Sequence, residues 1–180
     1  MKKLLTILSM SLLLAGPSFA QHIEREDQPD IIESIHDRRM ETAIAEARAS
    51  LDVFFEEMDR IGSSRGEFAI KVGLPTNDGS FEHIWVIDVS GDPDGTMTGF
   101  LQNEPFDIVG NLSLGDKVSF QRDDVTDWLY RDGTKYRGHF TTRILIETYP
   151  QETIDAFMSS LHANPLPTSS PATAKGSSKH

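Results

Sequence analysis

The sequence contains no cysteine, and this absence removes several kinds of chemistry. An exported chain without cysteine has no disulfide framework and no thiol nucleophile. Zinc and iron–sulfur clusters held by cysteine are excluded for the same reason. The six histidines form neither a His-x-His pair nor an HExxH motif, so their spacing does not favour a metal site. We therefore expect no cofactor, no bound metal and no catalytic residue.

Positive charge is also scarce in this sequence. There are 17 Lys and Arg residues against 28 Asp and Glu residues, which gives a formal net charge of −11. Nucleic acid and anionic lipid both repel such a chain, so we expect neither as a partner. The excess of negative charge fits solubility or a basic protein partner.

The N-terminal segment 1–20 has the three parts of a secretory signal peptide. Lys2 and Lys3 are positively charged, residues 4–15 are apolar, and the segment closes with Ser18 and Ala20 at the positions that signal peptidase recognises. The alternative is a retained membrane anchor, but the apolar run is shorter than the roughly 20 residues that span a bilayer. We expect cleavage after Ala20, a periplasmic or secreted protein, and no membrane span in the mature form.

The remaining chain is long enough for one domain. Residues 21–37 are acidic and contain Pro29, which indicates an extended lead-in. Apolar residues then recur at steps of three and four, and this spacing predicts an amphipathic helix over 38–60 that ends before Gly62. We expect a single domain over 38–162 and a disordered tail over 163–180, because the tail is rich in Pro, Ser and Thr.

The β region is expected over residues 67–146. Alternating and β-branched residues, separated by turns rich in Gly, Pro, Asn and Asp, predict strands. These strands are expected at 67–74, 81–89, 96–102, 117–122, 125–130 and 136–146, and a short helix is expected at 152–162. One long helix followed by short strands is an α+β pattern. We predict that the N-terminal amphipathic helix packs on a curved antiparallel sheet or a small open β-barrel.

Polar and aromatic side chains are distributed over both faces of the strand 81–89. Alternation places His83 and Trp85 on one face and Glu82 on the other, so Glu82 and His83 cannot act as an adjacent acid–base pair. His139 lies on the predicted last strand and is a possible neighbour of His83 across the sheet. A metal site there would need a third ligand, such as Glu82, Asp116 or Asp127, at a spacing that is not typical of such sites.

Two further side chains are candidates for a contact surface. Trp128 follows Asp127, and an exposed Trp beside a charge often marks a binding surface, although burial in the core is the alternative. Arg143 lies in an otherwise apolar stretch, where a charge is commonly paired. Asp127 and Glu82 are its expected partners.

Four linked motifs carry a family resemblance. The stretches "GSFEHIWV", "GFLQNEP", "LSLGDKVSF" and "VTDWLYRDGTKYRGHFTTR" occur in this order. In order and spacing this chain resembles the YegJ-like family of small bacterial proteins, a domain of unknown function, from about Phe68 to Ile146. Phe140 stands where many members have Tyr. The resemblance implies a fold and a set of positions, but no reaction.

Several of these positions have a direct structural interpretation. Gly115 suits a tight turn that Asp116 caps, and Gly99 and Gly138 allow close approach or a bulge. We expect Arg143, Asp127, Glu82 and His83 to form one polar network.

The preferred hypothesis is an exported, non-enzymatic binding module whose partner is an envelope protein or a small polar ligand. One alternative is an immunity or inhibitor protein for a basic partner. A second is a hydrolase that uses His83 or His139 with Asp127 or Glu82. A third is a purely structural domain whose polar cluster is buried and fully paired. The candidate binding residues are Glu82, His83, Trp85, Asp127, Trp128, His139 and Arg143.

Overall fold

The computed structural model describes residues 38–63 and 67–168. The expected signal peptide and acidic lead-in lie outside the described residues, as do positions 169–180 of the tail. Among the residues that the structure describes, no helix has the length and apolar character needed to cross a membrane.

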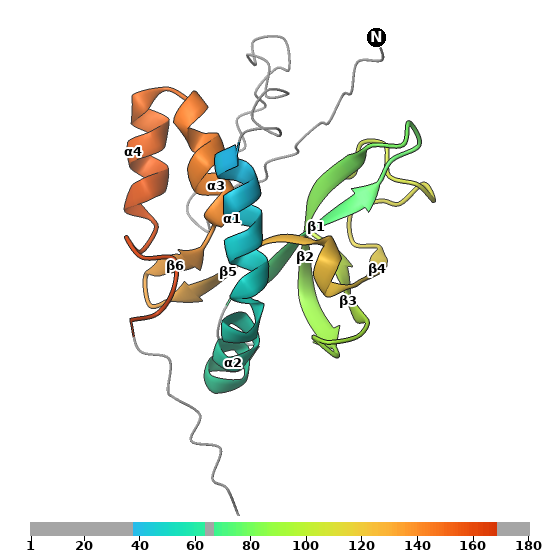
Figure 1. The fold of residues 1–180 in the computed structure, drawn as a ribbon, viewed down its shortest axis with the longest axis horizontal. Coiled ribbons are helices and arrows are strands. Elements are labelled where there is room, and N and C mark those ends of the chain that lie inside the picture. The colour runs from blue at the N-terminus through green and yellow to red at the C-terminus, as the bar shows by residue number, and fades with distance from the viewer. Residues whose placement is uncertain (1–37, 64–66, 169–180) are drawn as a thin grey trace, which may run out of the picture.

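The described chain is an α+β fold with six antiparallel strands in one sheet, as the sequence predicts (Figure 1). The α-helices are α1 (Arg38–Ala49), α2 (Leu51–Ile61), α3 (Phe140–Leu145) and α4 (Gln151–Ser159). The strands are β1 (Phe68–Pro75), β2 (Phe81–Gly91), β3 (Met97–Leu101), β4 (Lys117–Phe120), β5 (Val125–Asp132) and β6 (Lys135–Gly138). The strand order is β4-β3-β2-β1-β5-β6, so the sheet is open and does not close into a barrel.

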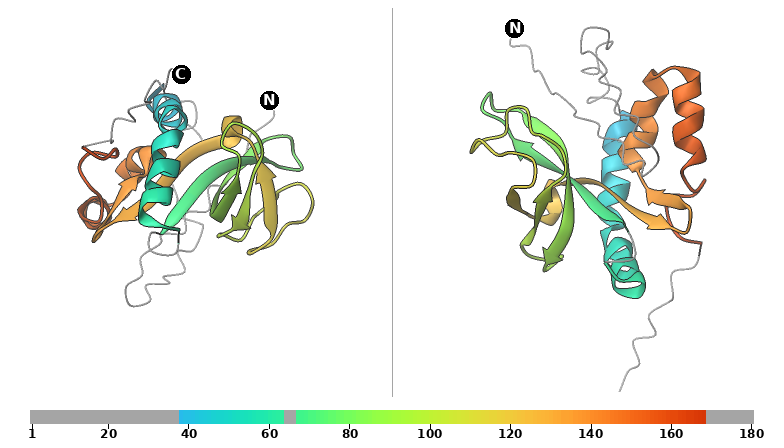
Figure 2. Two further views of the ribbon diagram at one scale, coloured as in Figure 1. Left: turned by 90° about the horizontal axis from the view of Figure 1, so that it is seen from below. Right: turned by 180° about the vertical axis from the view of Figure 1, so that it is seen from behind.

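Apolar side chains form a core on each face of the sheet. Helices α1 and α2 contribute to the larger core, and the segment around α4 contributes to the smaller one (Figure 2). The larger core includes Ala47, Leu51, Phe54, Ile70 and Trp128. The smaller core includes Ala69, Trp85, Leu129, Ile146 and Phe157. Successive residues of β1 and β5 therefore enter opposite cores, as the alternation of side chains along a strand requires.

The helix predicted over 38–60 is interrupted at Ser50. Its hydroxyl donates to the carbonyl of Glu46 at 2.7 Å and accepts a hydrogen bond from the Trp128 indole at 3.2 Å. A serine hydroxyl that bonds to the carbonyl four residues earlier competes with the helical backbone and often bends a helix. The predicted stop is confirmed, because Gly62 has a φ of 87° and donates its N–H to Met58.

The predicted strand 136–146 is wrong beyond Gly138. Residues Phe140–Leu145 form helix α3, although their β-branched composition favours a strand. Gly138 and His139 have φ values of 78° and 58°, which turn the chain out of the sheet. The carboxylate of Asp127 then accepts the N–H groups of Phe140 and Thr141 and starts the helix. Arg143 consequently lies on a helix.

A bulge changes the expected faces of β2. The pairing of β2 with β3 shifts between Ile87 and Ser90, and Asp88 has a φ of 50°. Simple alternation along the strand would place Val89 on the same face as Trp85, but the bulge directs it into the larger core. The close approach expected at Gly99 is confirmed, since a Cβ there would lie 2.4 Å from a methyl carbon of Val86.

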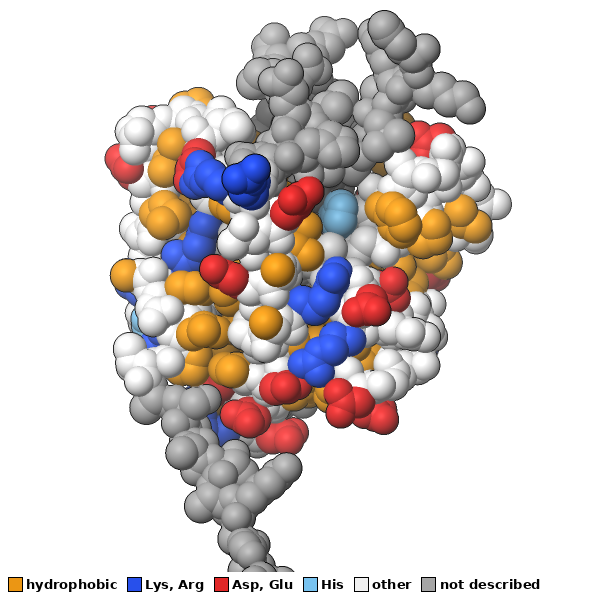
Figure 3. Space-filling model, viewed as in Figure 1, with side chains coloured by type: hydrophobic (Ala, Val, Ile, Leu, Met, Phe, Trp, Pro, Cys, Tyr) orange, Lys and Arg blue, Asp and Glu red, His pale blue; other side chains and the backbone are white. Residues whose placement is uncertain are grey.

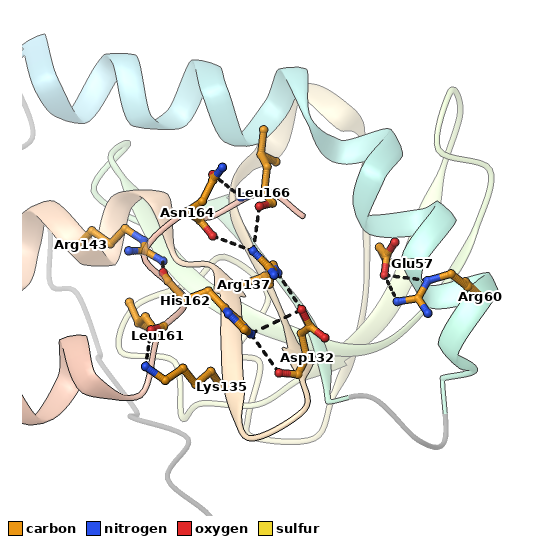
Figure 4. A network of polar contacts seen from close by, with 10 residues as sticks. All are labelled: Glu57, Arg60, Asp132, Lys135, Arg137, Arg143, Leu161, His162, Asn164 and Leu166. Atoms are coloured by element: carbon orange, nitrogen blue, oxygen red, sulfur yellow. Dashed lines mark hydrogen bonds and ion pairs between the residues drawn. The ribbon is translucent and has the colours of Figure 1, made fainter. Parts of the chain in front are cut away.

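The first part of the predicted disordered tail is ordered. Residues 160–166, here called the C-terminal strap, run along β6, where Gly138 N–H donates to the carbonyl of Pro165. Arg137 donates to the carbonyls of Asn164 and Leu166 at 3.1 and 2.8 Å (Figure 4). The strap covers what would otherwise be an open sheet edge.

Candidate functional site

Asp127 is the centre of a buried polar cluster. The cluster comprises Lys71, Asp127, His139, Thr141 and Thr142. Asp127 has an exposed fraction of 0%. Its carboxylate accepts the Thr141 hydroxyl at 2.6 Å and the N–H groups of Trp128, Phe140 and Thr141 at 2.8 to 2.9 Å. With its oxygens engaged by these donors, Asp127 is a structural cap and is not placed to act as a general base.

Lys71 is a member of this cluster that the sequence interpretation missed. Its side chain is buried, and Nζ donates to Thr141 Oγ1 at 3.2 Å and lies 4.7 Å from the centroid of the Trp85 ring. Burial lowers the pKa of Lys71, and the Asp127 carboxylate opposes that shift. The sequence does contain a sign that Lys71 is buried. Apolar residues flank it in "FAIKVGL", and strand alternation directs its side chain toward the smaller core.

The two candidate histidines are held in the neutral form. Burial, and secondarily Lys71, lowers the pKa of His139 to about 3 and that of His83 to about 4. His139 Nδ1 lies 3.3 Å from Thr142 Oγ1, and His83 Nδ1 lies 3.2 Å from Thr126 Oγ1. No hydrogen bond or ion pair joins His83 or His139 to a carboxylate within the described residues, so the predicted acid–base pairs are not formed there. Within residues 38–63 and 67–168, no group of three His, Cys, Asp or Glu side chains is arranged to hold a metal ion.

The remaining expected contact residues are not on a common surface. Trp128 is completely buried, and its indole N–H donates to the carbonyl of Ala47 at 3.0 Å. Arg143 donates to the carbonyls of Gly138 and His162 at 3.1 and 2.8 Å, and neither expected carboxylate is its hydrogen-bonding partner. Trp85 is also buried, in the smaller core.

Glu82 belongs to a second, separate network. It is buried on the face opposite His83, as expected, and its carboxylate accepts the N–H groups of Phe106 and Asp107 at 2.9 to 3.1 Å. The expectation of one network that joins Glu82, His83, Asp127 and Arg143 is therefore wrong. Glu82 fixes the loop between β3 and β4, whereas Asp127 fixes helix α3.

This loop and the adjacent hairpin form a surface that we call the acidic tip, residues 75–81 and 103–116. Phe81, Val109 and Leu114 have exposed fractions of 54, 50 and 58%. Figure 3 shows apolar side chains gathered over the end of the β1–β2 hairpin. Val109 N–H donates to the carbonyl of Pro75 at 2.9 Å, and Pro75 lies opposite Phe81 in the sheet. The two segments therefore form one surface.

Every formally charged side chain of the acidic tip is negative. It contains no Lys or Arg, and its acidic residues are Asp78, Glu104, Asp107 and Asp116. Hydroxyl groups of Ser80 and Thr76, with the Ser80 N–H, lower the pKa of Asp78 to about 2. Asp116 accepts the N–H of Ser113 at 2.8 Å, and Gly115 has a φ of 85°, which confirms the predicted turn.

Comparison with known proteins gives a family without a described activity. Residues 37–162 match the family described as "Uncharacterized protein conserved in bacteria (DUF2314)". The "Uncharacterized protein YegJ" of Escherichia coli (strain K12) is 32% identical over 162 residues, covering 89% of this chain and 99% of the relative. No solved structure matches. The YegJ-like resemblance of the motifs is confirmed by this relative, and the chain belongs to the DUF2314 family of bacterial proteins.

Proposed function

We propose that this protein is an exported, non-enzymatic binding module that uses the acidic tip to bind a basic protein of the cell envelope. Export is supported by the signal-peptide pattern of residues 1–20. The observation that carries the binding role is the exposed apolar surface of Phe81 and Val109, which the hydrogen bond between Val109 and Pro75 brings together, set among carboxylates and free of Lys and Arg.

Apolar side chains that are exposed together mark contact surfaces more often than they occur without a role. The two β1–β2 hairpin residues Pro75 and Phe81 and the loop residue Val109 meet at this tip. A partner that covers them gains hydrophobic free energy at about 25 cal/mol per Å² of apolar area. Phe81, an exposed aromatic side chain beside Val109, is the proposed anchor of the contact.

Charge defines the class of partner. None of the four carboxylates of the tip forms an ion pair within the described residues, and the whole chain carries a net charge of −11. A basic surface therefore approaches this protein along a favourable potential, whereas a second copy of the chain is repelled. We infer a cationic protein surface with apolar side chains at its centre.

The acidic tip is also held in shape before binding. Glu82 fixes the backbone of Phe106 and Asp107, and Asn77 donates to the Asp107 carboxylate at 2.7 Å. Such preorganisation reduces the entropy lost on association. The buried polar cluster supports the non-enzymatic part of the proposal, because its neutral His139 and its fully bonded Asp127 act as scaffold.

The proposal is tested by affinity capture from envelope extract, followed by binding measurements with the purified partner. The bait is the mature chain, and Phe81→Ser is compared with Met158→Ser, which alters an apolar side chain of 39% exposed fraction on α4. We expect a basic partner that binds wild type and Met158→Ser alike, with Phe81→Ser weaker by about tenfold or more. Equal binding by the two variants, or a partner without basic character, contradicts the proposal.

A further inference from the structure

Strand β2 extends beyond the strand that pairs with it on one side. It runs from Phe81 to Gly91, but its register with β3 begins only at Val86. The other side of β2 is paired with β1 along residues 81–87. The first residues of β2 therefore have β1 on one side and, within residues 38–63 and 67–168, no strand on the other.

The chain itself closes only the part of this edge at Trp85. Its carbonyl accepts the N–H of Gln102 at 2.8 Å, and its N–H donates to the side-chain oxygen of Asn103 at 3.2 Å. After Asn103 the loop leaves the edge, and its N–H groups at Phe106 and Asp107 bind the Glu82 carboxylate. In the part of the chain that the structure describes, no β-strand continues along this side of β2 toward Phe81.

Antiparallel geometry shows where the next free backbone groups point. The outward groups of Trp85 face away from β1, so those of His83, two residues earlier, face the same way. Pro75 lies opposite Phe81 and has no N–H to donate. This fits an alternation in which the backbone groups of Phe81, like those of His83, point away from β1. Among the described residues, no hydrogen bond is formed with the outward N–H or C=O of His83.

Two side-chain atoms at the same edge also lack partners. The amide nitrogen of Asn103, a residue with an exposed fraction of 1%, and the amide oxygen of Gln102 are buried without a hydrogen bond within the described part of the chain. A donor and an acceptor left unpaired beside an open strand edge match the polar groups of a peptide backbone. Phe81, at the end of the same edge, is exposed.

We propose that the partner of the acidic tip adds an extended segment to the edge of β2 at Phe81–His83. This inference rests on the proposed function and specifies its binding mode, which is β-strand addition. Backbone hydrogen bonds to His83 supply affinity without dependence on sequence. Specificity comes from an apolar side chain of the segment against Phe81 and from basic side chains beside the tip carboxylates.

The probe is a short synthetic peptide of alternating lysine and valine. Its control is the same peptide methylated on every backbone nitrogen, which has no backbone N–H to donate to a strand edge. In the free protein we expect the His83 amide to exchange hydrogen rapidly and the amide of Ile84, which faces β1, to exchange slowly. The peptide slows exchange at His83 by about tenfold or more, whereas the methylated peptide does not.

Two substitutions separate the backbone from the side chain. His83→Pro removes the outward N–H and is expected to weaken peptide binding by about tenfold, while His83→Ala retains the N–H and is expected to weaken binding by much less. A His83 amide already protected in the free protein, equal binding by the methylated peptide, or no peptide binding overturns strand addition. If Phe81→Ser weakens binding and His83→Pro does not, the proposed function stands and strand addition falls. Amide exchange in the wild-type protein decides the matter if His83→Pro does not fold.

Discussion

Asp127 and Thr141 are joined twice, because the Asp127 carboxylate accepts the backbone N–H of Thr141 at 2.9 Å and its hydroxyl at 2.6 Å. The same hydroxyl accepts a hydrogen bond from Lys71. Strands β1 and β5 and helix α3 therefore meet at one oxygen atom. A six-residue helix is too short to be stable alone, so α3 depends on this contact.

Replacing Asp127 is expected to destabilise the fold strongly. Asp127→Ala leaves the N–H groups of Phe140 and Thr141 without their acceptor in a buried site, and we expect a loss of about 3 kcal/mol in the free energy of unfolding. Asp127→Asn keeps one acceptor oxygen and should lose less. Urea denaturation measures both, with the exposed Asp155→Ala as control. A loss below about 1 kcal/mol for Asp127→Ala contradicts the role of Asp127 as the cap of α3.

Lys71 is expected to reduce stability at neutral pH. A buried ammonium without a strong ion pair is costly, so Lys71→Met should leave the free energy of unfolding unchanged or raise it by about 1–2 kcal/mol. The pKa of Lys71 is lower in the folded protein than in the unfolded chain. Between the folded pKa and about 10.4 the unfolded chain therefore binds more protons, and wild-type stability rises with pH over this interval.

Lys71→Met should lack this rise, which urea denaturation at several alkaline pH values will show. Lys71→Arg is the control, because a guanidinium stays charged and is expected to destabilise the protein. A large loss of stability in Lys71→Met would show that the ammonium itself holds the cluster together.

His139 is expected to make the fold sensitive to acid. Its pKa is near 6.5 in the unfolded chain and about 3 in the folded protein, so only the unfolded chain takes up a proton between these values. Stability from this group is present above pH 6.5 and is lost as the pH falls toward 3. The loss is on the order of 4 kcal/mol.

His139→Asn tests this pH dependence while tolerating the left-handed backbone at this position, where φ is 58°. The difference in stability between wild type and variant should shrink as the pH falls. His83→Asn should show the same trend over the narrower interval from 6.5 to about 4. Parallel stability curves for wild type and His139→Asn would refute the assignment.

The fold class and most strand positions could be predicted because they depend on local patterns. Period-two alternation and turn residues located β1, β2 and β3, and the spacing of Ala47, Leu51 and Phe54 indicated the buried helical face. Helix α3 could not be predicted in this way. Its β-branched sequence favours a strand, and a carboxylate thirteen residues earlier decides otherwise.

The candidate site was predicted in part for the same reason. Residue type singled out Asp127 and Glu82, but as binding residues of one network, because the pairing of polar groups depends on three-dimensional distance. Both carboxylates bind backbone N–H groups, which no sequence spacing reveals. The acidic tip was missed because its apolar side chains lie on two separate segments, which only the link between Val109 and Pro75 brings together.

Gly138 provides a sharp test of the turn that separates β6 from α3. Its φ is 78°, and a Cβ at this position would lie 2.0 Å from the carbonyl oxygen of Trp128. Gly138→Ala therefore requires the backbone itself to move, and we expect a loss of about 3 kcal/mol or more.

Gly133 is the matched control, because its φ is 66° but a Cβ there meets nothing within 4 Å. Gly133→Ala incurs only the conformational cost of the left-handed region, about 1–2 kcal/mol. Thermal or urea denaturation of both variants separates steric conflict from backbone strain. Equal losses would mean that the chain relaxes around Gly138, and that Asp127 alone, without the close approach of Gly138 to Trp128, directs the start of α3.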